Sequence, residues 1–415
     1  MTIRTILSQH AEEAAFLWAS RTRATSDPTY SLKTLGVVDD RVEAHLDGLR
    51  IAGDEGWAMC RSKLENGDAG EVFPLAILAF ESRDRQRMLD ALTAGCVSVD
   101  TRRALISALG WLDYSAVKPW LDRLLNAKNA LHRAVGVAAC AIHRKDPGTV
   151  LTASIGDPDP LLRARALRAT GELKRADLLN QVRAHVSDED EACRFWAAWA
   201  LTIHGEREGN RRLTQWLGHG DRFGEAALQL SLRAMSLDDG REWVRVLAKD
   251  PELRRSAVVG AGVLGDPTTM KWIIGHMQSP RLARLAGEAF SMMTGVDLVQ
   301  KGFDRTGPSE TEGEEPGDEA SDTSIGPEYD SHLPLPHAEL IDQWWQGHHS
   351  QLTPGVRYLA GQPLTIDTAR QILRAGKQRQ RAAAAVEIAL REPGEVLFEV
   401  RARSSVQRRY LNVGG

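Results

Sequence analysis

Apolar positions along most of the chain recur with the period of a helix rather than that of a strand. Ala257, Ala261 and Leu264, for example, fall on one helical face, one turn apart. Glycine ends many of these segments, as at Gly110 and Gly171, and a second amphipathic segment then begins. The pattern predicts helical hairpins whose small residues let neighbouring helices approach closely.

The hairpin pattern itself repeats. Alanine-rich stretches that carry arginine recur in steps of 29 to 32 residues, with one double step of 61 that contains a degenerate copy near residues 225–227. Their arginines are Arg103, Arg133, Arg165, Arg194, Arg255 and Arg284. A period of this length is typical of a solenoid, in which each repeat packs on its neighbours. We therefore predict an all-α fold, an α-solenoid with a period of about 30 residues.

Four tryptophans fall in the second helix of a predicted hairpin: Trp120, Trp216, Trp243 and Trp272. Two interpretations are open. The tryptophans pack one repeat on the next, or they form a partly exposed ladder along the inner face, where aromatic side chains act as binding anchors. As partner-binding candidates we take these tryptophans together with Glu312, Glu314 and Glu315.

Changes of pattern predict four regions. An N-terminal helical cap covers residues 1–34, the repeats cover 35–300, an acidic linker covers 301–336, and a mostly helical region covers 337–415. Residues 306–336 contain almost no apolar side chains, which predicts disorder. In the last region the pattern predicts helices over 338–345, 366–374 and 379–390, and a short strand over 396–400.

The charge of the chain is unevenly distributed. The 415 residues carry a formal charge of -4, but residues 304–330 hold ten acidic residues and one arginine, which leaves the rest at +5. The four cysteines are far apart and are expected to be small core residues. No stretch is apolar enough for a membrane span, and residues 1–10 lack the apolar core of a signal peptide. We expect a cytoplasmic protein without a membrane partner.

No motif indicates catalysis, and we expect neither an enzyme nor a cofactor. Residues 260–265 match the dinucleotide fingerprint GxGxxG, but they lie within a predicted repeat helix instead of after a strand. The histidines at 332, 337, 348 and 349 lack the spacing of a metal site. The acidic run 187–191 is explained by a loop and a helix start.

Two basic clusters leave nucleic-acid binding open as an alternative of another class. The first contains Arg163, Arg165, Arg168, Lys174 and Arg175, and the second contains Arg379, Arg381, Arg401, Arg403, Arg408 and Arg409. Helical repeats cradle nucleic acid with such residues. A solvated helix face explains the first cluster equally well, because its arginines cannot all point the same way.

The chain resembles known repeat families. Residues 157–171, which open with Asp157-Pro158-Asp159 and continue to Gly171, resemble the HEAT-like repeat named after phycobilisome lyases. Segments 46–57, 194–199, 262–267, 286–298 and 378–383 extend a resemblance, over nearly the whole length, to a bacterial family of HEAT-like repeat proteins often encoded near type VI secretion genes.

The resemblance implies an α-solenoid that acts in competition between bacteria. The implied role is an immunity protein that binds and neutralises a secreted effector, with an effector-loading adaptor as the alternative. An alternative of another class is a DNA-binding or DNA-base-processing protein, which would resemble the alkylpurine glycosylases built on similar repeats. A lyase activity does not follow, because the repeat is a scaffold. We therefore expect a protein-binding scaffold whose partner is a cognate type VI effector, with a nuclease as one candidate, and we do not expect a nucleic-acid partner.

Overall fold

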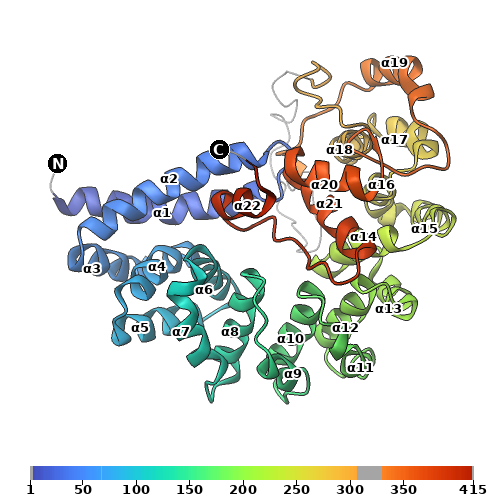
Figure 1. The fold of residues 1–415 in the computed structure, drawn as a ribbon. Coiled ribbons are helices and arrows are strands. Elements are labelled where there is room, and N and C mark those ends of the chain that lie inside the picture. The colour runs from blue at the N-terminus through green and yellow to red at the C-terminus, as the bar shows by residue number, and fades with distance from the viewer. Residues whose placement is uncertain (1–2, 67, 306–329, 414–415) are drawn as a thin grey trace, which may run out of the picture. The chain divides into compact units, whose positions relative to one another are not determined.

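The computed structural model describes residues 3–66, 68–305 and 330–413. The chain forms two compact units, and both are built mainly of helices (Figure 1). Unit 1 contains Met1–Gly209 and Glu392–Gly415, and unit 2 contains Asn210–Arg391. Nearly all regular structure in the described residues is helical, so the predicted all-α solenoid is confirmed. None of the helices described combines the length and the apolar character needed to cross a membrane.

The repeats of unit 1 are helical hairpins, each with a first and a second helix. The first helices pack on one another in sequence order; they are α4 (Val72–Ser82), α6 (Val99–Trp111), α8 (Ala130–Ile142), α10 (Pro160–Glu172) and α12 (Glu191–Ile203). The second helices are α5 (Arg85–Gly95), α7 (Tyr114–Leu125), α9 (Thr149–Ile155) and α11 (Leu179–Arg183). Helix α5 packs on α4 and α6, and each of the other three packs on the first helix of the following hairpin. Short 3-10 turns are η1 (Leu64–Asn66), η2 (Ala69–Glu71) and η3 (Ala176–Leu178).

Capping residues set the period of the repeat. A side-chain oxygen accepts hydrogen bonds from the first turn of successive first helices, in steps of 30 or 31 residues. These caps are Ser98, Asn129, Asp159, Asp190 and, in unit 2, Asp221. Each cap satisfies backbone N–H groups that a helix start otherwise leaves unpaired.

The recurring arginine lies four residues after the cap. Nη1 of Arg133 donates to the carbonyl oxygens of Ala127 and Lys128 in the preceding loop, at 3.0 and 2.8 Å. Arg163 and Arg194 donate in the same way to their own preceding loops. Loop stabilisation therefore explains three consecutive members of the recurrence, and among them Arg163, not the predicted Arg165, occupies the equivalent position.

The N-terminal part is a long hairpin of α1 (Ile3–Ala24) and α2 (Leu32–Ile51), followed by α3 (Asp54–Lys63). Leu35, Leu46 and Leu49 are fully buried on α2, which packs along α1. The predicted boundary at residue 34 therefore falls inside this hairpin. Trp18 on α1 stacks on Phe73 of α4 at 5.7 Å, so the hairpin shares the core of the repeats.

Unit 2 continues the hairpin pattern. Its first helices are α14 (Arg222–Ala234), α16 (Arg254–Leu264) and α18 (Ala283–Thr294), and its second helices are α15 (Leu237–Lys249) and α17 (Met270–His276). The helix α13 (Arg207–Leu213) spans the boundary between the units. Short 3-10 turns are η4 (Thr214–Trp216), η5 (Pro251–Leu253), η6 (Pro267–Thr269) and η8 (His349–Gln351).

The GxGxxG segment serves packing, as its place in the repeat predicts. A Cβ on Gly262 would lie 2.8 Å from Cα of Ala289, so the glycine lets α16 and α18 pack closely. Gly265 ends α16 with a φ of 67°, in the left-handed region that glycine favours. The segment lacks the preceding strand that a dinucleotide site requires.

The remainder of unit 2 contains α19 (Ala338–His348), α20 (Ile366–Ala375) and α21 (Gln378–Arg391), close to three predicted helices. Two short antiparallel strands, β1 (Tyr358–Leu359) and β2 (Gln362–Pro363), form a hairpin that was not predicted. Of the residues predicted to be disordered, 306–336, the part 306–329 lies outside the described residues. Residues 330–336 are packed instead: Asp330 pairs with Arg255, and Leu333 is buried.

The chain returns to unit 1 after α21. This return segment, residues 392–413, contains the helix α22 (Ser404–Leu411), which packs against α2. The strand predicted over 396–400 does not form. The predicted single region 337–415 is therefore divided between the two units, because its last part finds its packing partners among the N-terminal helices.

Candidate functional site

The predicted tryptophan anchors lie on second helices or next to them, and they differ in exposure. Trp216 in η4 is 2% exposed, so it packs in the core as the first interpretation predicts and offers no surface for a partner. Trp120, Trp243 and Trp272 are half-buried on α7, α15 and α17. Arg123 stacks on Trp120 at 4.1 Å. The structure places Trp120 in unit 1 and the others in unit 2.

The other predicted features do not form a site. Glu312, Glu314 and Glu315 lie outside the described residues. Among the described residues, no three histidine, cysteine or acidic side chains converge on a point where they could hold a metal ion. Cys60, Cys140 and Cys193 are buried, and burial raises the pKa of each thiol to about 12.

Three residues of the first basic cluster have internal partners in unit 1. Arg163 makes a two-pronged ion pair with Asp188, with distances of 2.8 and 2.9 Å. Arg175 pairs with Asp146 and Asp177, and Nζ of Lys174 donates to a backbone carbonyl at 2.9 Å. The positive charge needed to hold a nucleic-acid backbone is therefore largely engaged inside the repeats.

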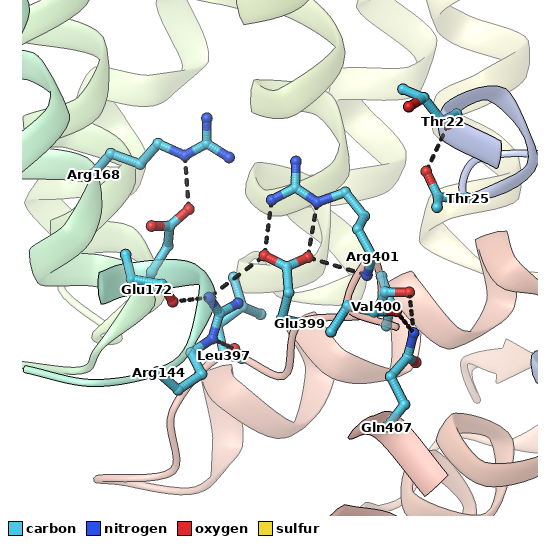
Figure 2. Close-up of polar contacts among 12 residues, drawn as sticks. Thr22, Thr25, Arg144, Arg168, Glu172, Leu397, Glu399, Val400, Arg401 and Gln407 are labelled. Atoms are coloured by element: carbon cyan, nitrogen blue, oxygen red, sulfur yellow. Dashed lines mark hydrogen bonds and ion pairs between the residues drawn. The ribbon is translucent and has the colours of Figure 1, made fainter. Parts of the chain in front are cut away.

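The first helices of unit 1 instead bind the return segment through its main chain. Leu397 N donates to the carbonyl oxygen of Glu172 at 3.1 Å, and Nε of Arg144 donates to the carbonyl oxygen of Leu397 (Figure 2). Both partners lie at the carboxyl ends of first helices, α10 and α8. Contacts to main-chain atoms hold an extended segment largely independently of its side chains.

Arg144 is held in a strained conformation that aims its side chain at this segment. Its φ is 54°, and Arg144 N and Lys145 N donate to the carbonyl oxygens of Ala141 and Cys140, which is a Schellman ending of α8. The equivalent ending of α12 uses Gly205. An arginine there costs about 1 kcal/mol or more relative to glycine. The contacts of its guanidinium with the return segment offset this cost.

The N-terminal hairpin binds the next part of the return segment. Nη1 and Nη2 of Arg21 donate to the carbonyl oxygens of Arg401 and Ala402, each at 2.8 Å. Nε of Arg21 also donates to Asp39, whose other carboxylate oxygen accepts from Ser404 N at 2.6 Å and so caps the start of α22. Arg21 of α1 and Asp39 of α2 therefore hold residues 401–404, which lie 365 to 381 positions further along the chain.

A buried carboxylate anchors the segment in the repeats. Glu399 is 7% exposed and accepts from Nε and Nη2 of Arg401 at 2.8 and 2.9 Å. Arg144 lies 3.5 Å away on the other side (Figure 2). Burial opposes ionisation, but Arg401 and Arg144 hold the pKa of Glu399 well below its usual range.

A second buried carboxylate, Glu172, lies in the same network. It accepts from Nη2 of Arg165 at 2.7 Å and from Nε of Arg168 at 2.8 Å. Burial alone would raise its pKa, but the charges of Arg165, Arg168 and Arg144 outweigh burial and lower it to about 2. Arg168 also stacks on Trp196 at 4.5 Å. Glu172 is therefore ionised at neutral pH and fixes two arginines of α10.

Unit 2 uses a related arrangement on its own first helix α14. Glu387 of α21 accepts from Nη1 of Arg233 at 3.1 Å, and both side chains are 1% exposed. Arg391 also pairs with Glu387. Burial lowers the pKa of Arg233 to about 10. In each unit, then, a buried carboxylate from the C-terminal part of the chain lies between an arginine of its own segment and an arginine on or just after a first helix.

Arg401 and Arg403 belong to the second basic cluster, a predicted candidate for nucleic-acid binding. In the structure Arg401 pairs with Glu399, and Arg403 pairs with Glu43 at 2.9 Å and stacks on Trp111 at 4.8 Å. The alternation of Glu399, Arg401 and Arg403 was the available signal for internal pairing. Arg381 of the same predicted cluster is fully buried.

Comparison with known proteins agrees with the repeat architecture. Residues 148–233 match the family model of HEAT repeats. This match covers α9 to α14 and includes Arg165, Arg168 and Glu172 of the network. A search of curated proteins finds no significant match to the chain.

Proposed function

We propose that the chain is a protein-binding helical-repeat scaffold without catalytic activity. The observation that carries the proposal is the contact of residues 397–404 with the rest of unit 1, where helix ends and the side chains of arginine and aspartate bind main-chain atoms of a segment that is irregular up to the start of α22. Stacked repeats offer a long surface that suits a macromolecule better than a small substrate.

The specific role we propose is that of an immunity protein, which neutralises a type VI secretion effector in the cytoplasm by occlusion. The support for this role is the resemblance of the sequence to a family found near such genes. A nuclease effector would present a basic cleft, and the acidic residues Glu312, Glu314 and Glu315 supply charge of the opposite sign. The half-buried Trp120, Trp243 and Trp272 are the aromatic anchors of this proposal.

The test is to purify the tagged protein from its native cells after nuclease treatment and to identify proteins that co-purify in stoichiometric amounts. The gene of such a partner is then expressed with and without this protein, and cell growth is measured. Restored growth is the result expected of an immunity protein. A stoichiometric partner without growth protection would assign an effector-loading role, and recovery of nucleic acid alone would refute the protein-binding proposal.

The tryptophan anchors are tested in the same assay. Trp243→Ala and Trp272→Ala should each lower recovery of the partner while the far-ultraviolet circular dichroism stays unchanged. Loss of helical signal in these variants would show instead that the two side chains are needed for packing.

A further inference from the structure

The network around the return segment contains more positive than negative charge. Four guanidinium groups, those of Arg144, Arg165, Arg168 and Arg401, surround the carboxylates of Glu172 and Glu399. Two positive charges are therefore left over in a partly buried place. Like charges at close range in a medium of low dielectric repel one another, so an additional anion would stabilise the cluster.

The arginines also have hydrogen-bond donors to spare. Nη1 of Arg165 is buried and has no hydrogen-bond partner in the structure described. Arg168 uses only Nε in its hydrogen bond to Glu172, which leaves both Nη groups available to a ligand. Figure 2 shows the guanidinium groups of Arg168 and Arg401 extending from their carboxylates in the same direction.

Both outward arginines are accessible to a ligand. The side chain of Arg168 is 34% exposed and that of Arg401 is 53% exposed. Burial lowers the pKa of Arg168 to about 10, and the positive charges of Arg165 and Arg401 act in the same direction. The negative charge of Glu172 acts in the opposite direction. Arg168 nonetheless keeps its charge at neutral pH, because this pKa is still well above 7.

We propose that Arg165, Arg168 and Arg401 form a carboxylate-binding site, which accepts an aspartate or glutamate side chain of a protein partner. Glu172 and Glu399 position the arginines and leave Nη1 of Arg165, Nη1 of Arg401 and both Nη groups of Arg168 for the ligand. The inference rests on the proposed protein-binding function and adds to it the chemistry of one contact.

The same site already shows how it holds a carboxylate on an extended chain. Glu399 is bound by two hydrogen bonds from one guanidinium, the geometry in which arginine recognises carboxylates best. A nucleic-acid backbone fits less well, because it brings several phosphates past Glu172 and Glu399, which would repel them, while the nearby Arg163 and Arg175 are already paired. An acidic side chain therefore matches the two excess charges better than a polyanion does.

The experiment measures binding of a fluorescent hexaglutamate peptide to the full chain at low salt by fluorescence anisotropy. We expect Arg168→Gln to weaken binding about tenfold, the change that loss of one charge-assisted hydrogen bond produces. Arg168→Lys keeps the positive charge but lacks the planar, two-pronged donor group of arginine. Its affinity for the peptide should therefore lie between those of Arg168→Gln and the wild type. Arg123→Gln is the matched control, because Arg123 also stacks on a tryptophan of unit 1 but lies outside the cluster, and it should bind like the wild type.

Three results would overturn the inference: no binding of hexaglutamate to the wild type, equal weakening by Arg123→Gln, or unchanged binding by both Arg168 variants. Tighter binding of a single-stranded oligonucleotide that is lost in the same Arg168 variants would reassign the site to nucleic acid. Thermal unfolding of each variant shows whether its fold is intact, and the lysine variant keeps the test decisive if the glutamine variant unfolds. Failure here combined with growth protection by the protein would refute the carboxylate site and leave the proposed function standing.

Discussion

Replacing Glu172 by glutamine tests whether the buried ion pairs stabilise unit 1. The pKa of this carboxyl is held at about 2, against an ordinary value of 4.5. That difference corresponds to about 3 kcal/mol of stability at pH 7. Glu172→Gln keeps the size of the side chain but loses the charge that balances Arg165 and Arg168. We therefore expect the free energy of unfolding of unit 1 to fall by about 3 kcal/mol at pH 7.

The pH dependence separates this cause from a packing defect. Because the pKa of the folded state lies below that of the unfolded state, the stabilisation by Glu172 is complete above about pH 5 and is lost as the pH falls from 4.5 towards 2. The difference between wild type and variant should therefore shrink to about 1 kcal/mol at pH 3.

The assay is urea unfolding followed by circular dichroism and tryptophan fluorescence at pH 7, 5 and 3, with separate fits if the two units unfold separately. Asp122→Asn is the control, since Asp122 is an exposed carboxylate of unit 1 paired with Lys118, and it should leave the midpoint nearly unchanged. Two results would refute the electrostatic explanation. In the first, the loss of unfolding free energy in Glu172→Gln is the same at pH 7 and pH 3. In the second, this loss is below about 1 kcal/mol at pH 7.

Three further predictions concern packing and thiol chemistry. Gly262→Ala should lower the free energy of unfolding by about 1–3 kcal/mol, because the added Cβ meets the backbone of α18. Gly275→Ala has open space around the added Cβ and should raise the free energy of unfolding by up to about 1 kcal/mol. Chemical unfolding of both variants measures these two changes. Trp216→Ala should cost about 3–5 kcal/mol and the half-buried Trp120→Ala clearly less, and equal losses in thermal unfolding would contradict the burial argument. In the folded protein Cys96 should react first with a disulfide reagent, and the three buried cysteines only after addition of denaturant; simultaneous reaction of all four thiols would contradict this order.

The local features of the fold could be predicted because they depend on neighbouring residues. Helical periodicity and the repeat of about 30 residues are properties of short windows, and the structure follows them. The predicted glycine stops are less accurate: Gly265 ends α16, but Gly110 and Gly171 lie inside α6 and α10. The register of the repeat could not be predicted as well, because both Arg163 and Arg165 fit the period. The cap at Asp159 decides among them, since the conserved geometry places the loop-binding arginine four residues after the cap.

The candidate site could not be predicted, because its contacts join residues that are far apart in sequence. Glu399 meets Arg144 and Arg401, and no local pattern says that a segment after α21 returns to α8 and α10. The interpretation of the arginines as a nucleic-acid surface treated their charge as unopposed. Pairing with a distant carboxylate is a tertiary event, and a hydrophobic period contains no information about it.

The return segment also ties the folding of unit 1 to the order of synthesis. A ribosome adds about 5–20 residues per second, and roughly 190 residues separate the end of α12 from Glu399. The N-terminal repeats therefore emerge on the order of ten to forty seconds before the carboxylate that Arg144 binds. During this interval Arg21 and Arg144 lack their backbone partners, and the site exists without its internal occupant. A nascent chain of this protein thus passes through a state in which the donors of Arg21 and Arg144 that later bind the return segment are open to other peptides.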